Sequence, residues 1–264
     1  MKSTDWLELF MNIGEDVSRE VMKVYGTPEA KTGIVKGAGG DITAKIDKIA
    51  EDVIIDAVKN CGEDVLLVSE EVGEITMGDS PEIVIFADPL DGSNNAKLGI
   101  PLFGVSLALA DDRTLDGVRV AYVKDIPGGD IFYAAKGRGA YCSGKKLKTK
   151  DDSNLGYLGF HIGEKGKGFD EILGVVRDAR HIRSYGSIAL SLCYVAAGSL
   201  DAYIDFRPPR LIDITAGKLI VEESGGFVRV DYDQEITPQT KANVIAAKNA
   251  ELYGHILGTL NMRE

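Results

Sequence analysis

The beginning of the chain repeats apolar residues with the period of an α-helix. Over residues 5–25 the apolar side chains lie three or four positions apart, and Gly26-Thr27-Pro28 ends the run. A second helical pattern begins near residue 45, with Ile46, Ile49, Val53 and Ala57 on one face. Between the two helices, residues 33–41 hold four glycines, which predicts a loop.

From residue 65 the helical period gives way to short apolar runs that are bounded by turn residues. These runs predict buried strands at 65–69, 82–89, 103–110, 117–123 and 130–135, and a glycine-punctuated hairpin at 136–148. After a charged, glycine-rich stretch at 149–168, which we interpret as a boundary or surface excursion, helices and strands alternate. The pattern predicts helices near 168–179, 187–198, 213–224 and from 249, and strands at 201–206, 227–230 and 243–247. We therefore predict a mixed α and β fold (α+β) with two halves, 1–148 and 149–264, that share one cleft.

Composition narrows the classes of function. The 264 residues are 44% apolar and 27% charged, as in a globular protein, and carry a net charge of −11. The acidic balance argues against nucleic acid and against an anionic membrane surface as partners. No apolar run approaches the ~20 residues of a membrane span, and the N-terminus does not resemble a signal peptide. Three isolated cysteines favour a reducing compartment, so we expect a cytoplasmic protein.

The strongest chemical signal is the segment Asp88-Pro89-Leu90-Asp91-Gly92-Ser93. It follows a buried strand directly, so a proline-stiffened turn can direct both carboxylates and the Leu90 carbonyl to one point. Gly92 and Ser93 can begin a helix whose backbone N–H groups face the same point, which suits a phosphate. Oxygen ligands of this kind suit Mg²⁺. Taken alone, the segment also fits an acidic β-turn.

Further acids lie where they can join this point. Glu70 ends the strand before Asp88, and Asp213 and Asp47 each stand at the start of a predicted helix, where they are also plausible N-caps. Clustered carboxylates repel one another and raise each other's pKa, and divalent ions remove that repulsion. The same ions would activate a water and neutralise a phosphoryl group. No nucleotide-binding P-loop and no Cys-x5-Arg phosphate loop is present in the sequence.

In these motifs and their order, the chain resembles the inositol monophosphatase family of Mg²⁺-dependent phosphatases. The resemblance covers nearly the whole chain and rests on the segment with Asp41, Thr43 and Asp47, the pair Glu70-Glu71, the segment from Asp88 to Ser93, and the segment from Asp213 to Gly217. The archaeal branch, which acts on inositol 1-phosphate and fructose 1,6-bisphosphate, is the most similar. The resemblance implies a layered α-β-α-β-α sandwich, a homodimer, and a role in carbohydrate metabolism and gluconeogenesis.

The resemblance also implies roles for individual residues. Two or three Mg²⁺ ions would be held by Glu70, Asp88, the Leu90 carbonyl, Asp91 and Asp213. Asp47 and Ser93 would orient the attacking water, with Glu70 beside them as a third catalytic residue. The substrate, a phosphorylated sugar or cyclitol, would contact Asp91, Gly92, Ser93, Arg183, Gly186, Ser187, Ile188 and Arg207, with Arg210 as the alternative to Arg207. Lys36 would lie in a loop that closes over the site and helps to bind a third ion.

Two other functions stay open at this point. One is a nucleotide 3′-phosphatase or NADP phosphatase on the same fold, although no adenine platform is evident in the sequence. The other is a regulatory binding protein with weak catalysis, although such a scaffold would be expected to lack one of the metal ligands. The full set of acids favours the phosphomonoesterase.

Overall fold

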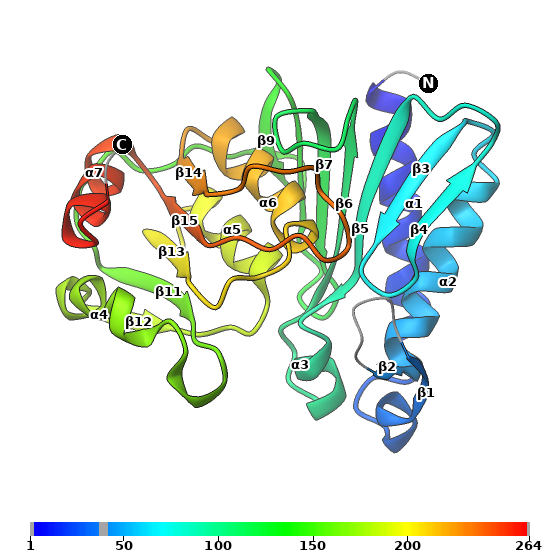
Figure 1. The fold of residues 1–264 in the computed structure, drawn as a ribbon, viewed down its shortest axis with the longest axis horizontal. Helices are drawn as coiled ribbons and strands as arrows, with labels where there is room; N and C mark the ends of the chain where they lie inside the picture. The colour runs from blue at the N-terminus through cyan, green and yellow to red at the C-terminus, as the bar shows by residue number, and fades with distance from the viewer. Residues whose placement is uncertain (1–2, 37–41, 263–264) are drawn as a thin grey trace.

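Five alternating layers of helices and sheets make up the computed structural model, which describes residues 3–36 and 42–262 (Figure 1). Two helices form the first layer, two lie between the sheets, and two cover the far side of the second sheet. In that order the helices are α1 (Ser3–Val21) and α2 (Lys45–Lys59), α5 (Ile188–Ala196) and α6 (Ile212–Glu223), and α4 (Phe169–Asp178) and α7 (Ala250–Thr259). The fold is thus the expected α-β-α-β-α sandwich, which confirms the predicted α+β class.

The first sheet has eight strands in the order β10-β9-β8-β7-β6-β5-β3-β4. All neighbours are antiparallel except β3 and β5, which run parallel. This one parallel pair matters for function because it brings two carboxyl strand ends together at one edge. The strands are β3 (Val65–Ser69), β4 (Gly73–Met77), β5 (Ile83–Asp91), β6 (Gly104–Ala110), β7 (Val118–Asp125), β8 (Ile131–Ala135), β9 (Gly139–Cys142) and β10 (Lys145–Lys146).

The second sheet has five strands in the order β12-β11-β13-β15-β14. Its central strand β13 runs parallel to β11 and antiparallel to β15. The strands are β11 (Tyr157–His161), β12 (His181–Arg183), β13 (Ala202–Asp205), β14 (Phe227–Val230) and β15 (Val244–Ala247). Among the described residues the remaining elements are short, namely β1 (Gly33–Lys36), β2 (Ile42–Ala44), α3 (Ser93–Leu98) and the 3-10 turns η1 (Pro28–Lys31) and η2 (Glu164–Gly166).

The apolar stripe of α1 explains why this helix packs against the first sheet. Trp6, Phe10, Ile13 and Val17 are buried and pack with α2 against the first sheet. A Cβ at Gly14 would lie 2.0 Å from Oη of Tyr122 on β7, so α1 can approach the sheet closely only because residue 14 has no side chain.

The middle layer joins the two sheets. Helix α6 is buried around most of its circumference, apart from the side that carries Lys218 and Glu222, and its buried residues share one core cluster with α5 and with both sheets. Helix α6 begins at the cleft between the sheets, so its first turn carries Asp213 to that cleft.

Two expectations from the sequence were wrong in part. Residues 33–36 of the predicted loop form strand β1, which pairs with β2, while 37–41 lie outside the described residues. The stretch 149–168 holds β11, an interior strand of the second sheet, because the apolar run YLGFH lies within charged and glycine-rich surroundings. In the described part of the chain, no helix combines the length and the apolar character needed to cross a bilayer.

Candidate active site

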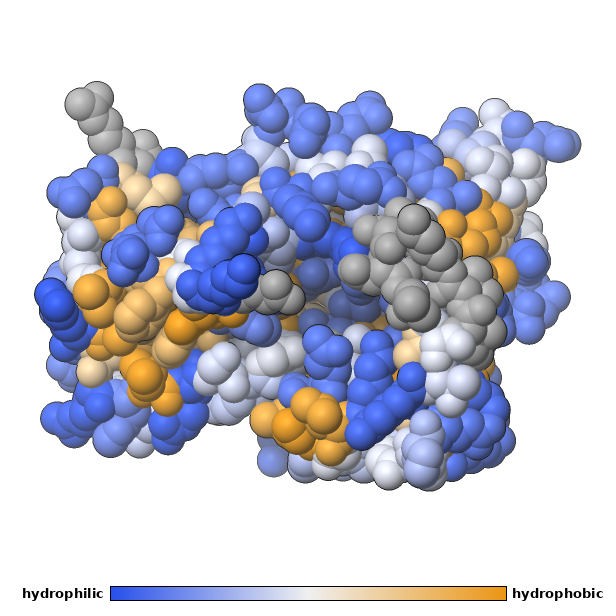
Figure 2. Space-filling model, turned by 60° about the horizontal axis from the view of Figure 1, so that its bottom comes forward, coloured by the Kyte–Doolittle hydropathy of each residue, from blue (hydrophilic) through white to orange (hydrophobic). Residues whose placement is uncertain are grey.

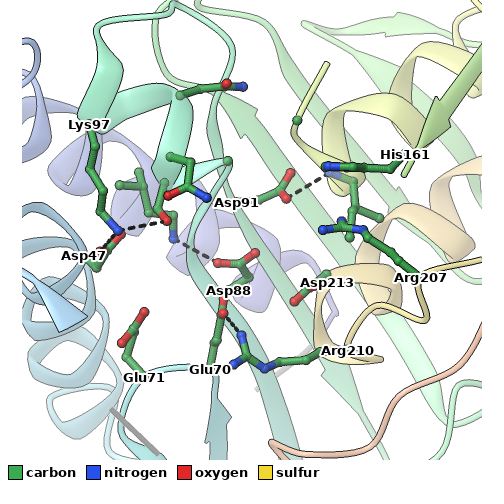
Figure 3. A pocket seen from close by; sticks show the side chains of 17 residues that line it. Asp47, Glu70, Glu71, Asp88, Asp91, Lys97, His161, Arg207, Arg210 and Asp213 are labelled. Carbon is green, nitrogen blue, oxygen red and sulfur yellow. Dashed lines mark hydrogen bonds and ion pairs between the residues drawn. The ribbon is translucent and has the colours of Figure 1, made fainter. Parts of the chain in front are cut away.

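A cleft of about 680 Å³ opens where β3 and β5 end and α3, α5 and α6 begin. The space-filling view shows the hollow between the two halves of this face, with hydrophilic residues along its walls (Figure 2). Six of its lining residues are carboxylates, and Figure 3 shows Asp47, Glu70, Glu71 and Asp88 on one side, Arg207 and His161 on the other, and Asp91 and Asp213 between them. The cleft is therefore a polar site with an acidic and a cationic wall.

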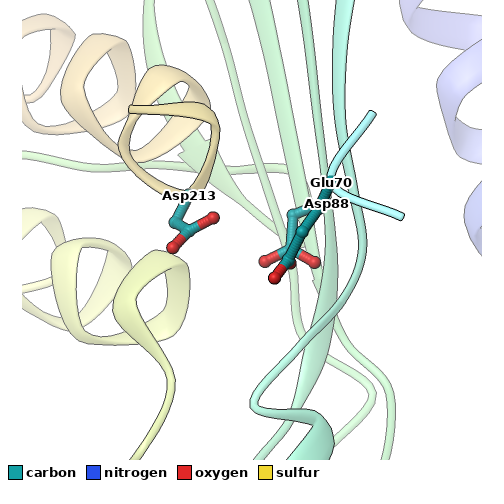
Figure 4. Close-up of side chains that lie close together, drawn as sticks. All are labelled: Glu70, Asp88 and Asp213. Atoms are coloured by element: carbon teal, nitrogen blue, oxygen red, sulfur yellow. The ribbon is translucent and has the colours of Figure 1, made fainter. Parts of the chain in front are cut away.

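Three of these acids form a cluster (Figure 4). Ser69 pairs with Ala87 in the parallel register of β3 and β5, so Glu70 and Asp88 follow side by side at the ends of the two strands. Asp213 faces them from the first turn of α6. Each of the three residues offers a carboxylate oxygen within 4.8 Å of the others. Residues from three distant parts of the chain thus converge on one point.

The cluster is electrostatically unfavourable without a cation. Burial raises the pKa of Asp88 well above its usual value, and the charges of Asp213 and Asp91 raise it further. Burial and Asp91 raise the pKa of Asp213 to about 7. The Oδ1 atom of Asp213 is buried and has no hydrogen-bond partner among the described residues, while Glu70 forms an ion pair with Arg210. Converging, partly unsatisfied carboxylates of this kind fit a divalent cation that prefers oxygen ligands.

Asp91 lies three residues beyond Asp88 and is held differently. Its carboxylate accepts hydrogen bonds from the Ser187 hydroxyl and from the backbone N–H groups of Ile188 and Ala189, both at 2.9 Å. These donors are the N-terminus of α5, and Ser187 also caps that helix through Leu190 N. Burial raises the pKa of Asp91, and these hydrogen bonds counteract the rise. Ser187 and Ile188 therefore contact Asp91 in this structure.

A tight turn leads from Asp91 into α3. Gly92 has a φ of 86°, and a Cβ there would lie 2.9 Å from the Leu102 carbonyl, so only glycine fits. Asn95 then donates hydrogen bonds to the carbonyls of Leu102 (2.7 Å) and Tyr185 (2.6 Å). These bonds hold Gly186 beside the turn at Gly92, and both glycines line the cleft with Ser93.

Asp47 occupies the opposite end of the acidic wall. It is the third residue of α2, and its Oδ2 accepts a hydrogen bond from the N–H of Ala44 (3.2 Å). Lys97 of α3 lies 2.7 Å from the same oxygen and also donates to Oγ of Ser93 at 3.2 Å. Asp47 and Ser93 are thus linked through the ammonium group of Lys97.

The cationic wall comes from the second half of the chain. Arg207 lies beside the cleft because its Nε donates to Asp205 (2.8 Å), a fully buried acid at the end of β13. Arg210 reaches the cluster at Glu70. His161, at the end of the neighbouring strand β11, also lines the cleft, and burial together with the charge of Arg207 lowers its pKa. The wall carries two guanidinium groups and an imidazole whose pKa is lowered.

Not every residue named from the sequence lies in the cleft. Arg183 stands on the edge strand β12, is exposed, donates to the carbonyl of Ile182, and has its guanidinium 5.6 Å from the centre of the Tyr157 ring. The structure does not bring it to the acids. Lys36 ends β1, but its side chain lies outside the described residues, as does Asp41 entirely. All other predicted site residues line the cleft except Ser187, which lies behind it against Asp91.

Sequence reasoning missed several residues that shape the site. Asn95 lies two residues beyond the predicted segment from Asp88 to Ser93, and Lys97 and His161 belong to no motif. Glu51, buried on α2, accepts hydrogen bonds from the Ser69 hydroxyl (2.9 Å) and from Val72 N (2.7 Å), and so fixes the turn that carries Glu70 and Glu71. The only sequence signal for Glu51 is its position, because it is an acidic residue at the edge of the apolar face of an amphipathic helix.

Comparisons with known proteins agree with this fold and identify the family. A sequence model described as the inositol monophosphatase family matches residues 4–262. A fructose-1,6-bisphosphatase/inositol-1-monophosphatase from Methanothermobacter thermautotrophicus is 36% identical, with 97% of each chain covered. A bifunctional NADP phosphatase/NAD kinase from Methanococcus maripaludis is 33% identical over 98% of this chain and 50% of its own length. A solved structure from Pyrococcus horikoshii, described as having similarities to inositol-1 monophosphatase, aligns with a TM-score of 0.84 and 32% identity over all of both chains.

Proposed function

The chain belongs to the inositol monophosphatase family, and from this premise we propose that it is a Mg²⁺-dependent phosphomonoesterase that hydrolyses inositol 1-phosphate and fructose 1,6-bisphosphate. The observation that carries the proposal is the cluster of Glu70, Asp88 and Asp213 beside the turn at Gly92 and Ser93. Acids that converge in this way suit a phosphate ester only in the presence of cations, because carboxylates alone would repel the substrate.

We assign Glu70, Asp88, the Leu90 carbonyl, Asp91 and Asp213 as the residues that would hold two or three Mg²⁺ ions. When bound, such ions supply a water of lowered pKa and neutralise charge on the phosphoryl group. Two observations support this assignment. The N-terminus of α5 orients the carboxylate of Asp91, and Oδ1 of Asp213 has no hydrogen-bond partner in the described chain.

The other residues of the site bind and orient the substrate. The backbone N–H groups of Gly92 and Ser93 hold the phosphate, and Ser93 together with Asp47 orients the attacking water. The hydroxyl groups of the substrate meet Gly186 and Ile188, which line the cleft, while Ser187 acts through its hydrogen bond to Asp91. Arg207 faces the far end of the cleft, where a guanidinium group suits the second phosphate of a bisphosphate. Arg210 donates through Nη1 to Glu70, a proposed metal ligand, whereas Arg207 uses Nε for its bond to Asp205, so we assign the substrate contact to Arg207 rather than to Arg210.

The test is phosphate release from inositol 1-phosphate, fructose 1,6-bisphosphate, NADP and 3′-phosphoadenosine 5′-phosphate, each with Mg²⁺ and with EDTA. We expect turnover of the first two with Mg²⁺ and none with EDTA. The similarity to the NADP phosphatase/NAD kinase favours NADP hydrolysis as a second candidate activity. Turnover of NADP alone would replace the substrate assignment, and equal turnover in EDTA would overturn the metal assignment.

We further propose that the protein is a cytoplasmic homodimer. The three cysteines, which form no disulfide, support a reducing compartment. Light scattering after size-exclusion chromatography should give about twice the 28.4 kDa mass of one chain, and a monomer mass would contradict the proposal.

A further inference from the structure

Lys97 joins two residues that the proposed reaction uses for the attacking water. It lies one helical turn after Ser93 on α3, so both side chains lie on the same face of that helix. Its Nζ is 2.7 Å from Oδ2 of Asp47 on α2 and 3.2 Å from Oγ of Ser93, and Figure 3 shows the ammonium group of Lys97 next to the carboxylate of Asp47. The side chain is only 22% exposed, and that of Asp47 is 3% exposed.

These contacts fix which atoms of Asp47 and Ser93 remain for other partners. Oδ2 of Asp47 is bonded to Lys97 and to the N–H of Ala44, whereas Oδ1 is buried and has no hydrogen-bond partner among the described residues. Oγ of Ser93 accepts a bond from Lys97, so the hydroxyl proton of Ser93 points away from the ammonium group. Lys97 thus occupies one oxygen of Asp47 and one lone pair of Ser93, which leaves Oδ1 of Asp47 and the hydroxyl proton of Ser93 for other partners.

We propose that Lys97 is a positioning residue for the proposed reaction, and that its ammonium group holds Asp47 and Ser93 in the arrangement that orients the attacking water. The inference rests on the proposed phosphatase function. Some other lysine–carboxylate pairs are exposed, such as Lys48 with Asp52, and one is buried, Lys248 with Asp201. Lys97 differs because it lines the cleft together with both of its partners, Asp47 and Ser93. A buried carboxylate needs a compensating charge, and here that charge also contacts the second residue of the pair.

The role depends on both the charge and the reach of Lys97. Removing the charge with Lys97→Met should leave substrate binding in place but let Asp47 and Ser93 turn. We expect kcat to fall by about 10²-fold, the usual cost of a misplacement near 1 Å, while KM changes by less than about threefold. Lys97→Arg keeps the charge and should restore kcat to within about tenfold of the unchanged enzyme.

The experiment is steady-state hydrolysis of inositol 1-phosphate at saturating Mg²⁺ by the unchanged enzyme, K97M, K97R, S93A and the double variant K97M/S93A. The matched control is K48M, which breaks an exposed pair on α2 and should not change kcat. If Lys97 acts through Ser93, the double variant should lose little more than the worse single variant, because their effects are not additive. Thermal unfolding is recorded for each variant, and K97Q replaces K97M if the methionine variant does not melt cooperatively.

Three results would overturn the inference. The first is an unchanged kcat in folded K97M. The second is a loss confined to KM together with weaker inhibition by inorganic phosphate, because that pattern identifies Lys97 as a phosphate ligand instead. The third is an equal loss in K97R and K97M, which would mean that the charge is irrelevant. Failure of the unchanged enzyme to release phosphate from any substrate is a separate result, since it removes the proposed function and the inference with it.

Discussion

Asp88 and Asp91 are three residues apart, both buried, and both lie in the cleft, yet their surroundings are opposite. Asp91 is surrounded by neutral donors, namely the hydroxyl of Ser187 and two backbone N–H groups of α5. Within the described residues, Asp88 accepts one hydrogen bond, from Leu90 N at 3.0 Å, and it faces Asp213 and Glu70. Burial raises the pKa of both groups, but for Asp88 neighbouring acids add to the rise, whereas for Asp91 hydrogen bonds reduce it.

The difference separates two tasks that one acidic motif performs. Asp91 ties β5 to α5 and so supports the fold whether or not a cation is bound. Asp88 destabilises the fold until a cation compensates its charge, because like charges are held together out of water. Neutralising each residue should therefore change stability with opposite signs.

The largest expected effect is on turnover in Asp88→Asn. The amide keeps an oxygen for Leu90 N but removes the charge that would hold Mg²⁺, so we expect kcat to fall by at least about 10³-fold, which corresponds to several kcal/mol of lost metal stabilisation. In EDTA the same variant should melt at a higher temperature than the unchanged protein. A lower Tm in EDTA would contradict the contrast with Asp91. Phosphate release and thermal unfolding measure the two effects.

The next effect is a dependence of stability on pH that arises from Asp213. Its pKa is about 7 in the folded chain and 3.8 in a solvated one, so the folded state binds the extra proton. Stability in EDTA should therefore fall as pH rises from about 4 to about 7, by roughly 1.4 kcal/mol per unit of pKa difference at most, and then level off. Asp213→Asn should remove this slope. If the difference in Tm between the unchanged protein and Asp213→Asn stayed constant from pH 4 to pH 8, the raised pKa of Asp213 would be refuted.

A smaller loss of stability is expected for Asp91→Asn. The side-chain amide would have to turn an NH₂ group toward the donors of α5, which costs about 1–3 kcal/mol for unsatisfied buried groups. At roughly 2–4 °C per kcal/mol for a chain of this size, the Tm should fall measurably in EDTA. Ser187→Ala removes one of the donors to Asp91 and the N-terminal cap of α5. It should lower the free energy of unfolding by about 1 kcal/mol. If Asp91→Asn raised Tm as Asp88→Asn does, the two acids would have the same role.

The smallest effect is expected at Arg183. Because this side chain lies on the exposed edge strand and not in the cleft, Arg183→Ala should change kcat/KM for either substrate by less than about twofold, as for other surface substitutions. Arg207→Ala should lower kcat/KM for fructose 1,6-bisphosphate more than for inositol 1-phosphate. If Arg183→Ala lowered kcat/KM for the bisphosphate more than for inositol 1-phosphate, Arg183 would contact the substrate even though it lies outside the cleft of its own chain.

Most strands and helices could be predicted from the sequence, because their apolar residues recur with a clear period and turn residues flank them. The sequence also predicted that Glu70 and Asp88 could be neighbours, since two strands that end in acids needed only to be adjacent, and β3 and β5 are. Strand β11 was missed because charged and glycine residues surround its five residues. The pairing of Lys97 with Asp47 could not be foreseen, because it depends on how α2 and α3 pack. The catalytic and binding roles assigned from the resemblance stay predictions.

The position of α6 between the two sheets has a consequence for chain entropy. Asp213 meets Asp88 across about 125 intervening positions, and closing so long a loop is entropically costly. The apolar surface of α6 drives this closure while the acid at its first turn opposes it. A divalent ion held between the two carboxylates would then act as a removable cross-link across that loop, so a chelator should loosen the attachment of the second half of the molecule as well as stop the chemistry.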